Sequence, residues 1–344
     1  MVKLGRMRSS RRIESPRRPP NDGCSDAAGS DEDEAHGSEA DDVKLEARTD
    51  AGKMITTILS SLLLRDNKSS QSAIAWCTVS DAGLTFTVSE AKTLQATAYI
   101  KSQLFHEWRL AEELTGADAE SLQFGINLAT LVECLKIFSG TGAENQLHLT
   151  FRAATACLQL TLVEGKVVTN CTIHTMDVEP EEVLQPSGDG NVRIVLPADM
   201  LASGLAELDW GGDQAQKDKK VTIGVQMQPL QLSMTVASED MGCEMVFPHD
   251  ALIVCHVGRA LEFSYRFALL RMALKSLQEA EEACLQLDLD GLLDLKIKFA
   301  NAQFVQFFVQ PLLEEEDDDG LGPEPIKTPA ANLHAQGAAL DDDW

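Results

Sequence analysis

The chain contains Ser121-Leu-Gln-Phe-Gly-Ile-Asn127, which has the pattern of a β-strand, and continues directly as Leu128-Ala-Thr-Leu-Val-Glu-Cys-Leu-Lys-Ile-Phe138, which has the spacing of an amphipathic helix. The same order returns as the strand Asn191-Val-Arg-Ile-Val-Leu196 and the helix Pro197-Ala-Asp-Met-Leu-Ala-Ser-Gly-Leu-Ala-Glu-Leu208. Several alternating segments typical of strands follow each copy. A repeat on this scale predicts one fold built twice, and it favours an architectural role over catalysis.

Length and charge limit the possible functions. At 344 residues the chain can hold two domains of ordinary size, each with its own core. Its net charge is −25, whereas affinity for duplex DNA comes mainly from Lys and Arg side chains that neutralise phosphates. We therefore do not expect a general binder of nucleic acid. A role on DNA needs either a local basic surface or a topological link to the DNA.

The cysteines and the apolar runs indicate the environment of the protein. Eight cysteines are scattered singly and none forms a CxxC pair, which predicts free thiols in a reducing compartment. No apolar stretch reaches the ~18 residues that span a bilayer, and the start of the chain has no hydrophobic signal region. We expect no association with a membrane and no secretion.

Composition divides the chain into five segments. Residues 1–42 hold a basic stretch and then an acidic block, and residues 314–344 are again acidic, so we expect both tails to be disordered. Residues 43–176 and 191–313 each predict two helices among many short antiparallel strands, with helices at 51–64, 128–138, 197–209 and 272–283. Residues 177–190, rich in Pro, Gly and acidic side chains, predict a connector between these two domains. The expected fold class is α+β.

Potential metal ligands do not form a recognisable site in the sequence. Asp288, Asp290 and Asp294 surround a glycine, but an EF-hand loop needs a further oxygen ligand before the glycine and a Glu at its twelfth position. We interpret these aspartates as the polar face of a strand that enters a turn. A structural zinc site needs four ligands in two closely spaced pairs. The pairs nearest to that spacing are Cys171 with His174 and Cys255 with His256.

Motifs of catalysis are also missing from the sequence. It contains no GxxxxGK[ST] phosphate loop, no GxSxG elbow and no GxGxxG turn. A metal-dependent nuclease needs several carboxylates that converge on two ions, whereas the acidic residues here lie mostly in tails, loops and alternating strand faces. We expect no catalytic residue, no metal site and no cofactor.

Basic residues of the folded part allow two interpretations. Solvated helix faces ordinarily carry Lys and Arg, so these residues are compatible with a plain surface. Alternatively, the faces share one side of the molecule and meet a polyanion. The residues lie on or beside three of the expected helices and are Lys53, Arg65, Lys136, Arg271 and Lys275.

Longer stretches resemble a known family, the radiation-sensitivity-one subunits of the nine-one-one checkpoint clamp. The likeness extends over about residues 43–316 and is spread along the chain. It is carried by Val88-Ser-Glu-Ala-Lys-Thr-Leu-Gln-Ala-Thr-Ala-Tyr-Ile100 with Leu104-Phe-His-Glu-Trp108, by Phe124 to Phe138, by Val167-Val-Thr-Asn-Cys-Thr-Ile-His-Thr175, by Glu179-Pro-Glu-Glu182, by Ala206-Glu-Leu-Asp209 and by Phe304-Val-Gln-Phe-Phe-Val-Gln-Pro311.

The resemblance implies a fold and a function. The family is similar to proliferating cell nuclear antigen, with two similar domains per subunit, three subunits in a ring, helices along the bore and sheets outside. It implies a heterotrimer with two sibling subunits, loaded by a clamp loader and encircling double-stranded DNA without sequence specificity. Such a clamp recruits checkpoint and repair proteins in the nucleus. The alternatives that we keep open are a homotrimeric replication processivity clamp and a metal-dependent 3′–5′ exonuclease.

The resemblance also assigns surfaces. It implies that two exposed strand edges, at 166–176 and 242–247, pair with the siblings by strand addition. The interface residues expected there are Val168, Asn170, Thr172, Cys243, Met245 and Phe247. The connector, with Glu179, Pro180, Glu181 and Glu182, is expected to cross the outer face beside a docking groove.

The sequence departs from the family pattern at two places. The third expected helix carries Asp199, Glu207 and Asp209 and no basic residue, which weakens the expectation of a uniformly positive bore. The basic-then-acidic N-terminal tail is unusual for the family. We interpret its Arg11-Arg12 and Arg17-Arg18 pairs as a nuclear import signal, with an organelle transit peptide as the alternative.

Overall fold

The structure is a computed structural model that describes residues 42–63, 74–116, 121–137, 145–179, 183–187, 191–210, 219–237 and 241–313. All of them belong to one compact unit that begins at Asp42. The two expected tails lie outside the described residues, apart from Asp42 itself.

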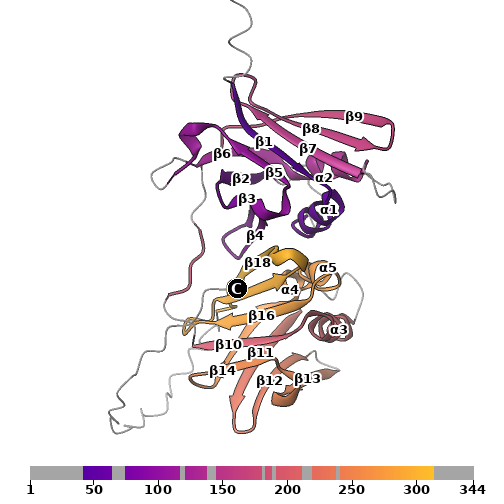
Figure 1. Ribbon diagram of the computed structural model, residues 1–344. Coiled ribbons are helices and arrows are strands. Elements are labelled where there is room, and N and C mark those ends of the chain that lie inside the picture. Colours follow the sequence, from indigo (N-terminus) through magenta and orange to yellow (C-terminus); the bar gives the residue numbers. More distant parts are fainter. Residues whose placement is uncertain are drawn as a thin grey trace, which may run out of the picture. The chain divides into compact units, whose positions relative to one another are not determined.

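Two halves of the chain repeat the same order of elements (Figure 1). The first half consists of β1 (Val43–Thr49), α1 (Gly52–Ser61), β2 (Ile74–Ser80), β3 (Gly83–Glu90), β4 (Leu94–Lys101), β5 (Glu107–Leu110), β6 (Leu122–Asn127), α2 (Leu128–Lys136), β7 (Asn145–Arg152), β8 (Cys157–Glu164) and β9 (Val167–His174). The second half consists of β10 (Val192–Pro197), α3 (Ala198–Leu208), β11 (Lys220–Met227), β12 (Leu230–Ala237), β13 (Gly242–Pro248), β14 (Val254–Val257), β15 (Leu261–Arg266), α4 (Phe267–Met272), α5 (Leu274–Leu277), β16 (Glu282–Leu287), β17 (Leu293–Lys298) and β18 (Phe304–Val309).

The strands form three antiparallel sheets, whose order follows the repeat. A five-stranded sheet has the order β5-β1-β7-β8-β9, a four-stranded sheet has the order β13-β12-β11-β15, and a nine-stranded sheet has the order β14-β10-β16-β17-β18-β4-β3-β2-β6. The nine-stranded sheet therefore contains the counterpart of each smaller sheet. Its two parts meet where β18 pairs with β4, with a register that runs from Phe304↔Tyr99 to Val309↔Leu94.

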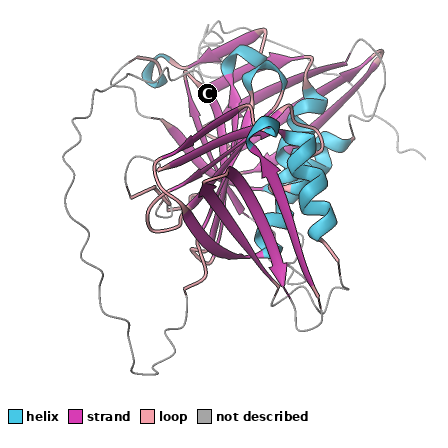
Figure 2. Ribbon diagram, turned by 90° about the horizontal axis from the view of Figure 1, so that it is seen from below, coloured by secondary structure: helices cyan, strands magenta, loops and turns pink. Residues whose placement is uncertain are grey.

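Helices cover one side of these sheets (Figure 2). α1 packs against α2, α3 packs against α5, and α1 also contacts α5 across the junction of the halves. The cause is amphipathic spacing: Ile55, Ile58 and Leu59 of α1 are buried towards the sheets, while Lys53 on the same helix is exposed.

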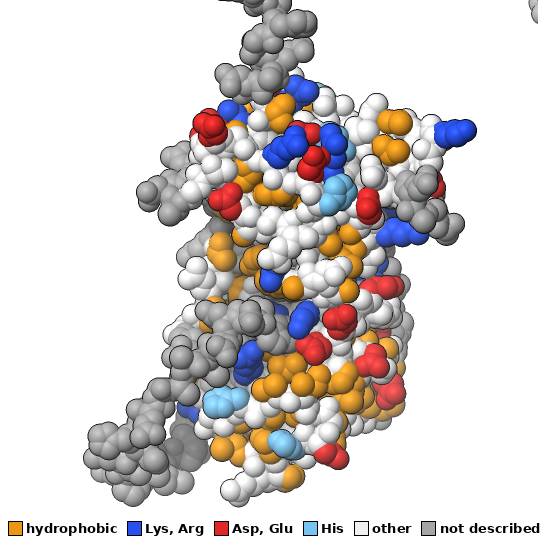
Figure 3. All heavy atoms as spheres, in the orientation of Figure 1, with side chains coloured by type: hydrophobic (Ala, Val, Ile, Leu, Met, Phe, Trp, Pro, Cys, Tyr) orange, Lys and Arg blue, Asp and Glu red, His pale blue; other side chains and the backbone are white. Residues whose placement is uncertain are grey.

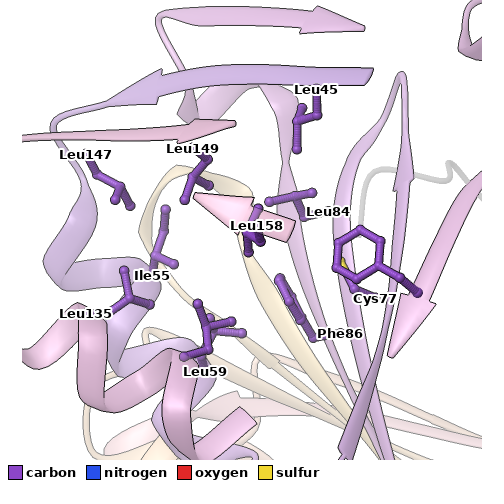
Figure 4. Close-up of a pocket in the computed structure, with 12 residues that line it drawn as sticks. Leu45, Ile55, Leu59, Cys77, Leu84, Phe86, Leu135, Leu147, Leu149 and Leu158 are labelled. Atoms are coloured by element: carbon purple, nitrogen blue, oxygen red, sulfur yellow. The ribbon is translucent and has the colours of Figure 1, made fainter. Parts of the chain in front are cut away.

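The core of the first half is a continuous apolar cluster. Side chains from α1, α2 and several strands point toward one another in Figure 4. The small cavity left between them measures about 20 Å³ and is lined by apolar side chains. Such a void holds at most one water and offers it no polar partner, so it is a packing imperfection and not a ligand site. The residues labelled in Figure 4 are Leu45, Ile55, Leu59, Cys77, Leu84, Phe86, Leu135, Leu147, Leu149 and Leu158.

The expected α+β fold is confirmed, but the repeat was matched wrongly in one respect. The counterpart of β10 and α3 is β1 with α1, because β1 lies between β5 and β7 as β10 lies between β14 and β16. The unit at 121–138, which is β6 with α2, corresponds to β15 with α4. A strand followed by a helix therefore occurs four times among the described residues, twice in each half, and the two elements are contiguous in every case except β1 and α1.

The fourth helix was also placed wrongly. We expected it at 272–283, but it begins at Phe267, is interrupted at Ala273 and ends at Leu277. Strand β15 ends at Arg266 because its partner β11 begins at Lys220, opposite that residue. Residues 282–287 form β16, which is paired on both sides, so sheet formation prevails there over helical spacing.

The two faces of β18 give a prediction for stability. Phe307 is 1% exposed and faces the helices, whereas Phe304 is half-buried on the opposite face and stacks on Tyr99 with ring centroids 4.2 Å apart. We expect Phe307→Ala to lower the free energy of unfolding by about 3–5 kcal/mol, and Phe304→Ala to lower it by less than half as much. Chemical denaturation measures both, and equal losses would contradict this assignment of faces.

Candidate nucleic-acid interface

A broad hollow lies on the helix layer. It measures about 1070 Å³ and is lined from α1, α2, α4 and α5. Four of the five basic residues expected to face DNA line it, while Arg65 lies outside the described residues. All four side chains are exposed, and they are Lys53, Lys136, Arg271 and Lys275. The fold therefore brings together basic residues that are far apart in the sequence.

The helices hold these side chains in different ways. Lys136 ends α2 and forms an ion pair with Glu133 one turn earlier, with Nζ and Oε1 2.8 Å apart. The Lys275 ammonium group lies 3.5 Å from the main-chain oxygen of Ser60, so it spans from α5 to the end of α1. Ion pairs on exposed helix surfaces stabilise by only a few tenths of a kcal/mol. The arrangement therefore costs little to exchange for contacts with a phosphate.

Arg271 has an acidic partner that the sequence did not reveal. Its Nε lies 2.9 Å from Oδ2 of Asp209, the residue that ends α3. We noted Asp209 only as a departure from a basic helix. In the fold it meets the cation of another helix, so the acidic end of α3 orients Arg271 within the hollow.

The side chain of Lys219 holds the end of α3 in place. Its ammonium group donates hydrogen bonds to the main-chain oxygens of Leu208 and Trp210, the second at 2.8 Å. It also lies over the rings of Trp210 and Phe267, 4.1 and 4.8 Å from their centroids. Burial lowers the pKa of Lys219, while nearby Asp209 raises it. We missed this residue, although the strand alternation extended back from Val221 indicates that position 219 faces inward.

The rest of the lining suits weak contacts with a polyanion. Hydroxyl and amide groups lie between the basic residues, and two acids, Asp209 and Glu279, reduce the local positive charge. Such groups can contact phosphate oxygens but offer no fixed pattern for reading base edges. The polar residues are Thr56, Thr57, Ser60, Ser61 and Gln278.

Charges on the sheet side of the first half are paired with each other. Figure 3 shows a compact group of basic and acidic side chains over the upper sheet. Arg48 and Arg109 alternate there with Glu46 and Glu107, with nitrogen–oxygen separations of 2.9–3.6 Å. His148 joins them, 3.2 Å from Glu46. This surface carries no excess of positive charge comparable with that of the hollow.

The two strands expected to form subunit edges do end sheets among the described residues. β9 is the last strand of the five-stranded sheet and β13 the last of the four-stranded sheet. Their expected interface residues face different ways, however. Val168, Asn170 and Thr172 on β9 are exposed on the face opposite the helices.

On β13 the expected residues face the helices. Phe247 is 5% exposed and Cys243 and Met245 are half-buried. Phe247 and Met245 lie against Gly204 of α3, where an added Cβ would come within 2.9 Å of the Phe247 ring. The exposed positions of β13 are Gly242, Glu244, Val246 and Pro248. Alternation alone separates the two faces, but it does not say which face meets the helices.

Only part of the expected connector set is described. Glu179 is exposed, and Pro180, Glu181 and Glu182 lie outside the described residues. The described segment 183–187 is held by contacts that we did not expect. The main-chain N–H of Leu184 donates to Oε1 of Gln95 at 2.8 Å, and Ser187 donates to the carboxylate of Asp288.

Two of the three aspartates around Gly291 do not lie on a solvated face, whereas Asp290 is exposed. Asp288 and Asp294 are 4% and 3% exposed, so our interpretation of them as a polar surface was wrong. Burial raises the pKa of Asp294, while Lys296 and the amide of Gln306 lower it. Each carboxylate is occupied by hydrogen bonds within the chain. Sequence patterns cannot reveal such partners, because Gln306 and Ser187 are distant in the sequence.

The described residues contain neither a metal-ligand cluster nor a membrane-spanning helix. No group of three or more His, Cys, Asp or Glu side chains in that part of the chain is placed to hold a metal ion. His174 contacts Cys157 at 3.2 Å rather than Cys171. Within the same part, every helix is too short or too polar to cross a bilayer.

Comparison with known proteins agrees with the fold and the repeat. The family model described as repair protein Rad1/Rec1/Rad17 matches residues 44–299. The cell cycle checkpoint protein RAD1 of Mus musculus is 28% identical over 277 residues, which cover 78% of this chain and 92% of that protein. The DNA damage checkpoint control protein rad1 of Schizosaccharomyces pombe is 23% identical over 273 residues, covering 71% and 82%.

A solved structure shares the architecture. The proliferating cellular nuclear antigen of Entamoeba histolytica superimposes with a TM-score of 0.63 at 18% identity, and the match covers 79% of this chain and 100% of that one. At such low identity the likeness shows the clamp fold alone. The family match, in contrast, extends over well more than half of the sequence, and on that basis the chain belongs to the Rad1/Rec1/Rad17 family of repair proteins.

Proposed function

We propose that this chain is one subunit of a heterotrimeric clamp that encircles double-stranded DNA at sites of damage and serves there as a platform for checkpoint and repair proteins. Two sibling subunits complete the ring, and a clamp loader places it on DNA. The relatives are named checkpoint proteins, and the fold is that of a clamp. The observation that carries the proposal comes from the repeat: β18 and β4, which pair inside the chain, correspond to β9 and β13, which lie at sheet edges.

This equivalence follows from the repeat. Inside the chain, β18 of the second half pairs with β4 of the first. The counterpart of β18 is β9, and the counterpart of β4 is β13. β9 and β13 each lie at one end of a smaller sheet, whose other ends are β5 and β15. Antiparallel pairing of β9 with β13 of the next subunit therefore repeats the junction that already exists within the chain, and three such pairs close a ring.

The helices support the same arrangement. Across the internal junction α1 contacts α5. Their counterparts are α3 and α2, so the pairing of edges brings α2 of one subunit beside α3 of the next. The helix layer then continues around the ring and faces the bore. Hydrophobic surface is available for this contact, because a groove of about 600 Å³ lies between α3 and β13, lined in part by Met200, Met245 and Phe247.

DNA contact in such a ring is weak and depends on topology. Four basic residues of one subunit face the bore, while the chain as a whole has a net charge of −25. Diffuse contacts with phosphates let a closed ring slide, and net acidity elsewhere limits adhesion to the outer surface. We propose that the acidic Asp209 contributes to this weakness by competing with phosphate for Arg271.

We further propose that the chain is not an enzyme and needs no cofactor. A metal-dependent exonuclease requires converging carboxylates, and the two buried aspartates of the described residues are each engaged in hydrogen bonds. Degradation of DNA by the pure protein with a divalent metal would contradict the proposal. A homotrimeric replication clamp has the same fold but trimerises alone, so the mass of the isolated chain in solution separates it from a checkpoint subunit.

The remaining assignments extend the proposal. We propose two clamp domains at 43–176 and 191–313, joined by the connector at 177–190 and flanked by the tails 1–42 and 314–344. We also propose a nuclear location. Support for this comes from the DNA repair and checkpoint names of the relatives and from the basic pairs of the N-terminal tail.

The edges can be tested one at a time. Val168 on β9 and Val246 on β13 are exposed apolar residues on strands that end sheets. We expect Val168→Asp to lose one sibling subunit and Val246→Asp to lose the other, because a charge buried in a strand pair is poorly tolerated. Met227→Asp is the control, since this residue is as exposed as Val246 but lies on an interior strand of its sheet.

Co-purification of the assembled subunits measures the result. If the assignment is correct, each edge variant still binds the other sibling and unfolds at the same temperature as the parent. Retention of both siblings by both variants would show that these edges do not close the ring.

The basic hollow can be tested by salt dependence. We expect replacement of Lys53, Lys136, Arg271 and Lys275 by Ala to weaken retention on DNA, and each lost phosphate contact to flatten the log–log salt dependence by about one unit. The effect is small singly and independent of base sequence, because contacts to the backbone position a protein without specifying a sequence.

A matched variant controls for total charge. Lys92, Lys101, Arg109 and Arg259 lie outside the helices of the structure, and their replacement by Ala removes the same four charges. Retention of the assembled clamp on circular DNA, measured from low to high salt, should fall for the first variant only. If both variants slide and dissociate like the parent, the helices do not face DNA.

A further inference from the structure

The connector is attached to both halves of the chain at defined points. At its start, Met176 and Gly125 exchange main-chain hydrogen bonds of 2.7 and 2.8 Å. Further along, Leu184 donates its N–H to the side chain of Gln95 on β4, and Gln95 is only 3% exposed. The last described attachment is to the second half, at the turn between β16 and β17.

That last attachment is made by one carboxylate. Oδ2 of Asp288 accepts hydrogen bonds from the main-chain N–H of Ser187 at 3.0 Å and from its hydroxyl group at 3.1 Å. Oδ1 of the same carboxylate accepts from the N–H groups of Asp290 at 3.0 Å and Leu292 at 2.8 Å. Each oxygen therefore has its own pair of donors, one pair from the turn and one from the connector.

The turn holds the carboxylate in place independently of the connector. Gly291 adopts φ +84°, a conformation that other residues rarely adopt, and its main-chain oxygen accepts a hydrogen bond of 2.8 Å from the hydroxyl group of Tyr265. Asp288 is thereby fixed from within its own hairpin. Oδ2 faces the connector, and among the described residues its hydrogen-bond donors are the N–H and the hydroxyl group of Ser187.

We propose that Asp288 is a positioning residue that latches residues 183–187 of the connector onto the second half. A buried carboxylate is unfavourable unless hydrogen bonds satisfy both oxygens, and among the described residues the second oxygen is satisfied by Ser187. If Ser187 is released, Oδ2 of Asp288 must bond to water instead. The connector then loses its attachment between Leu184, which is bonded to Gln95, and Asn191. The N–H of Asn191 donates to Leu287 at 3.1 Å, so the latch lies at the end of the connector.

The latch gives the connector a preformed conformation. A segment that is already ordered loses less conformational entropy when a partner binds it. This consequence rests on the proposed function, in which partners dock beside the connector. The latch itself does not depend on that function, because it is a property of the isolated chain.

Hydrogen exchange of the full chain tests the latch directly. A charge-assisted hydrogen bond to a buried carboxylate protects its amide, so we expect the Ser187 amide to exchange at least tenfold faster in Asp288→Asn. An Asn side chain has only one oxygen, and its NH₂ group would face N–H donors. The control is Asp290→Asn, which removes the same charge from an exposed neighbour and should leave the exchange of Ser187 unchanged.

A second variant separates the latch from the folding of the hairpin. Ser187→Asp leaves the Asp288 turn intact but places a second carboxylate against Oδ2. We expect exchange of residues 183–187 to accelerate as in Asp288→Asn, while the amides of Asp290 and Leu292 remain as protected as in the parent. Unchanged exchange at position 187 in Ser187→Asp would overturn the proposal, as would equal acceleration in Asp290→Asn.

Assembly with sibling subunits is measured on the same proteins and reports on a different question. Ser187 and Asp288 lie on neither of the edges β9 and β13, so Ser187→Asp should assemble like the parent. If the parent itself fails to assemble, the proposed function is wrong, whereas the exchange result still decides for or against the latch.

Discussion

Pairing of β18 with β4 is the interaction on which the rest of the structure depends. It joins the last strand of the second half to the first half through a ladder that runs from Phe304↔Tyr99 to Val309↔Leu94. Main-chain hydrogen bonds supply this ladder, and Phe307 packs beneath it on the helix side. Because the sheet is continuous, α1 and α5 are brought into contact, and their contact creates the hollow that collects basic residues from both halves.

Polar side chains on the other face of the junction make this pairing specific. Gln306 donates to the buried carboxylate of Asp294 at 2.9 Å and accepts from the hydroxyl group of Tyr99 at 3.2 Å. A shift of the register by one residue would turn these groups towards the apolar helix side and would break all of their hydrogen bonds. Burial of the Asp294 carboxylate is less favourable than an apolar pair at this position would be. Its hydrogen bonds, however, define the register that positions the two halves.

Much of the fold could be predicted from the sequence, because most of its strands and helices have recognisable local patterns of apolar and polar residues. Alternation located most strands, and helical spacing located three of the four helices. The fourth was misplaced because Phe267–Leu270 is apolar and fits a strand as well as a helix, so the place where β15 stops is determined by the start of its partner β11 at Lys220. The site was less predictable. Spacing indicated exposed basic residues, but neither the ion pair of Arg271 with Asp209 nor the inward position of Phe247 can be read locally.

Two residues whose roles the sequence did not reveal share one physical property. Lys219 and Asp288 are charged, buried, and satisfied in whole or in part by main-chain or hydroxyl groups outside their own structural elements. Each one ends a structural element that bears on function: Lys219 secures the end of α3 beside the basic hollow, and Asp288 secures the end of the connector. Apolar packing could hold these segments near the sheets, but it is not directional. A buried charge with fixed donors or acceptors instead places a main-chain segment at one position, here the end of α3 and the end of the connector.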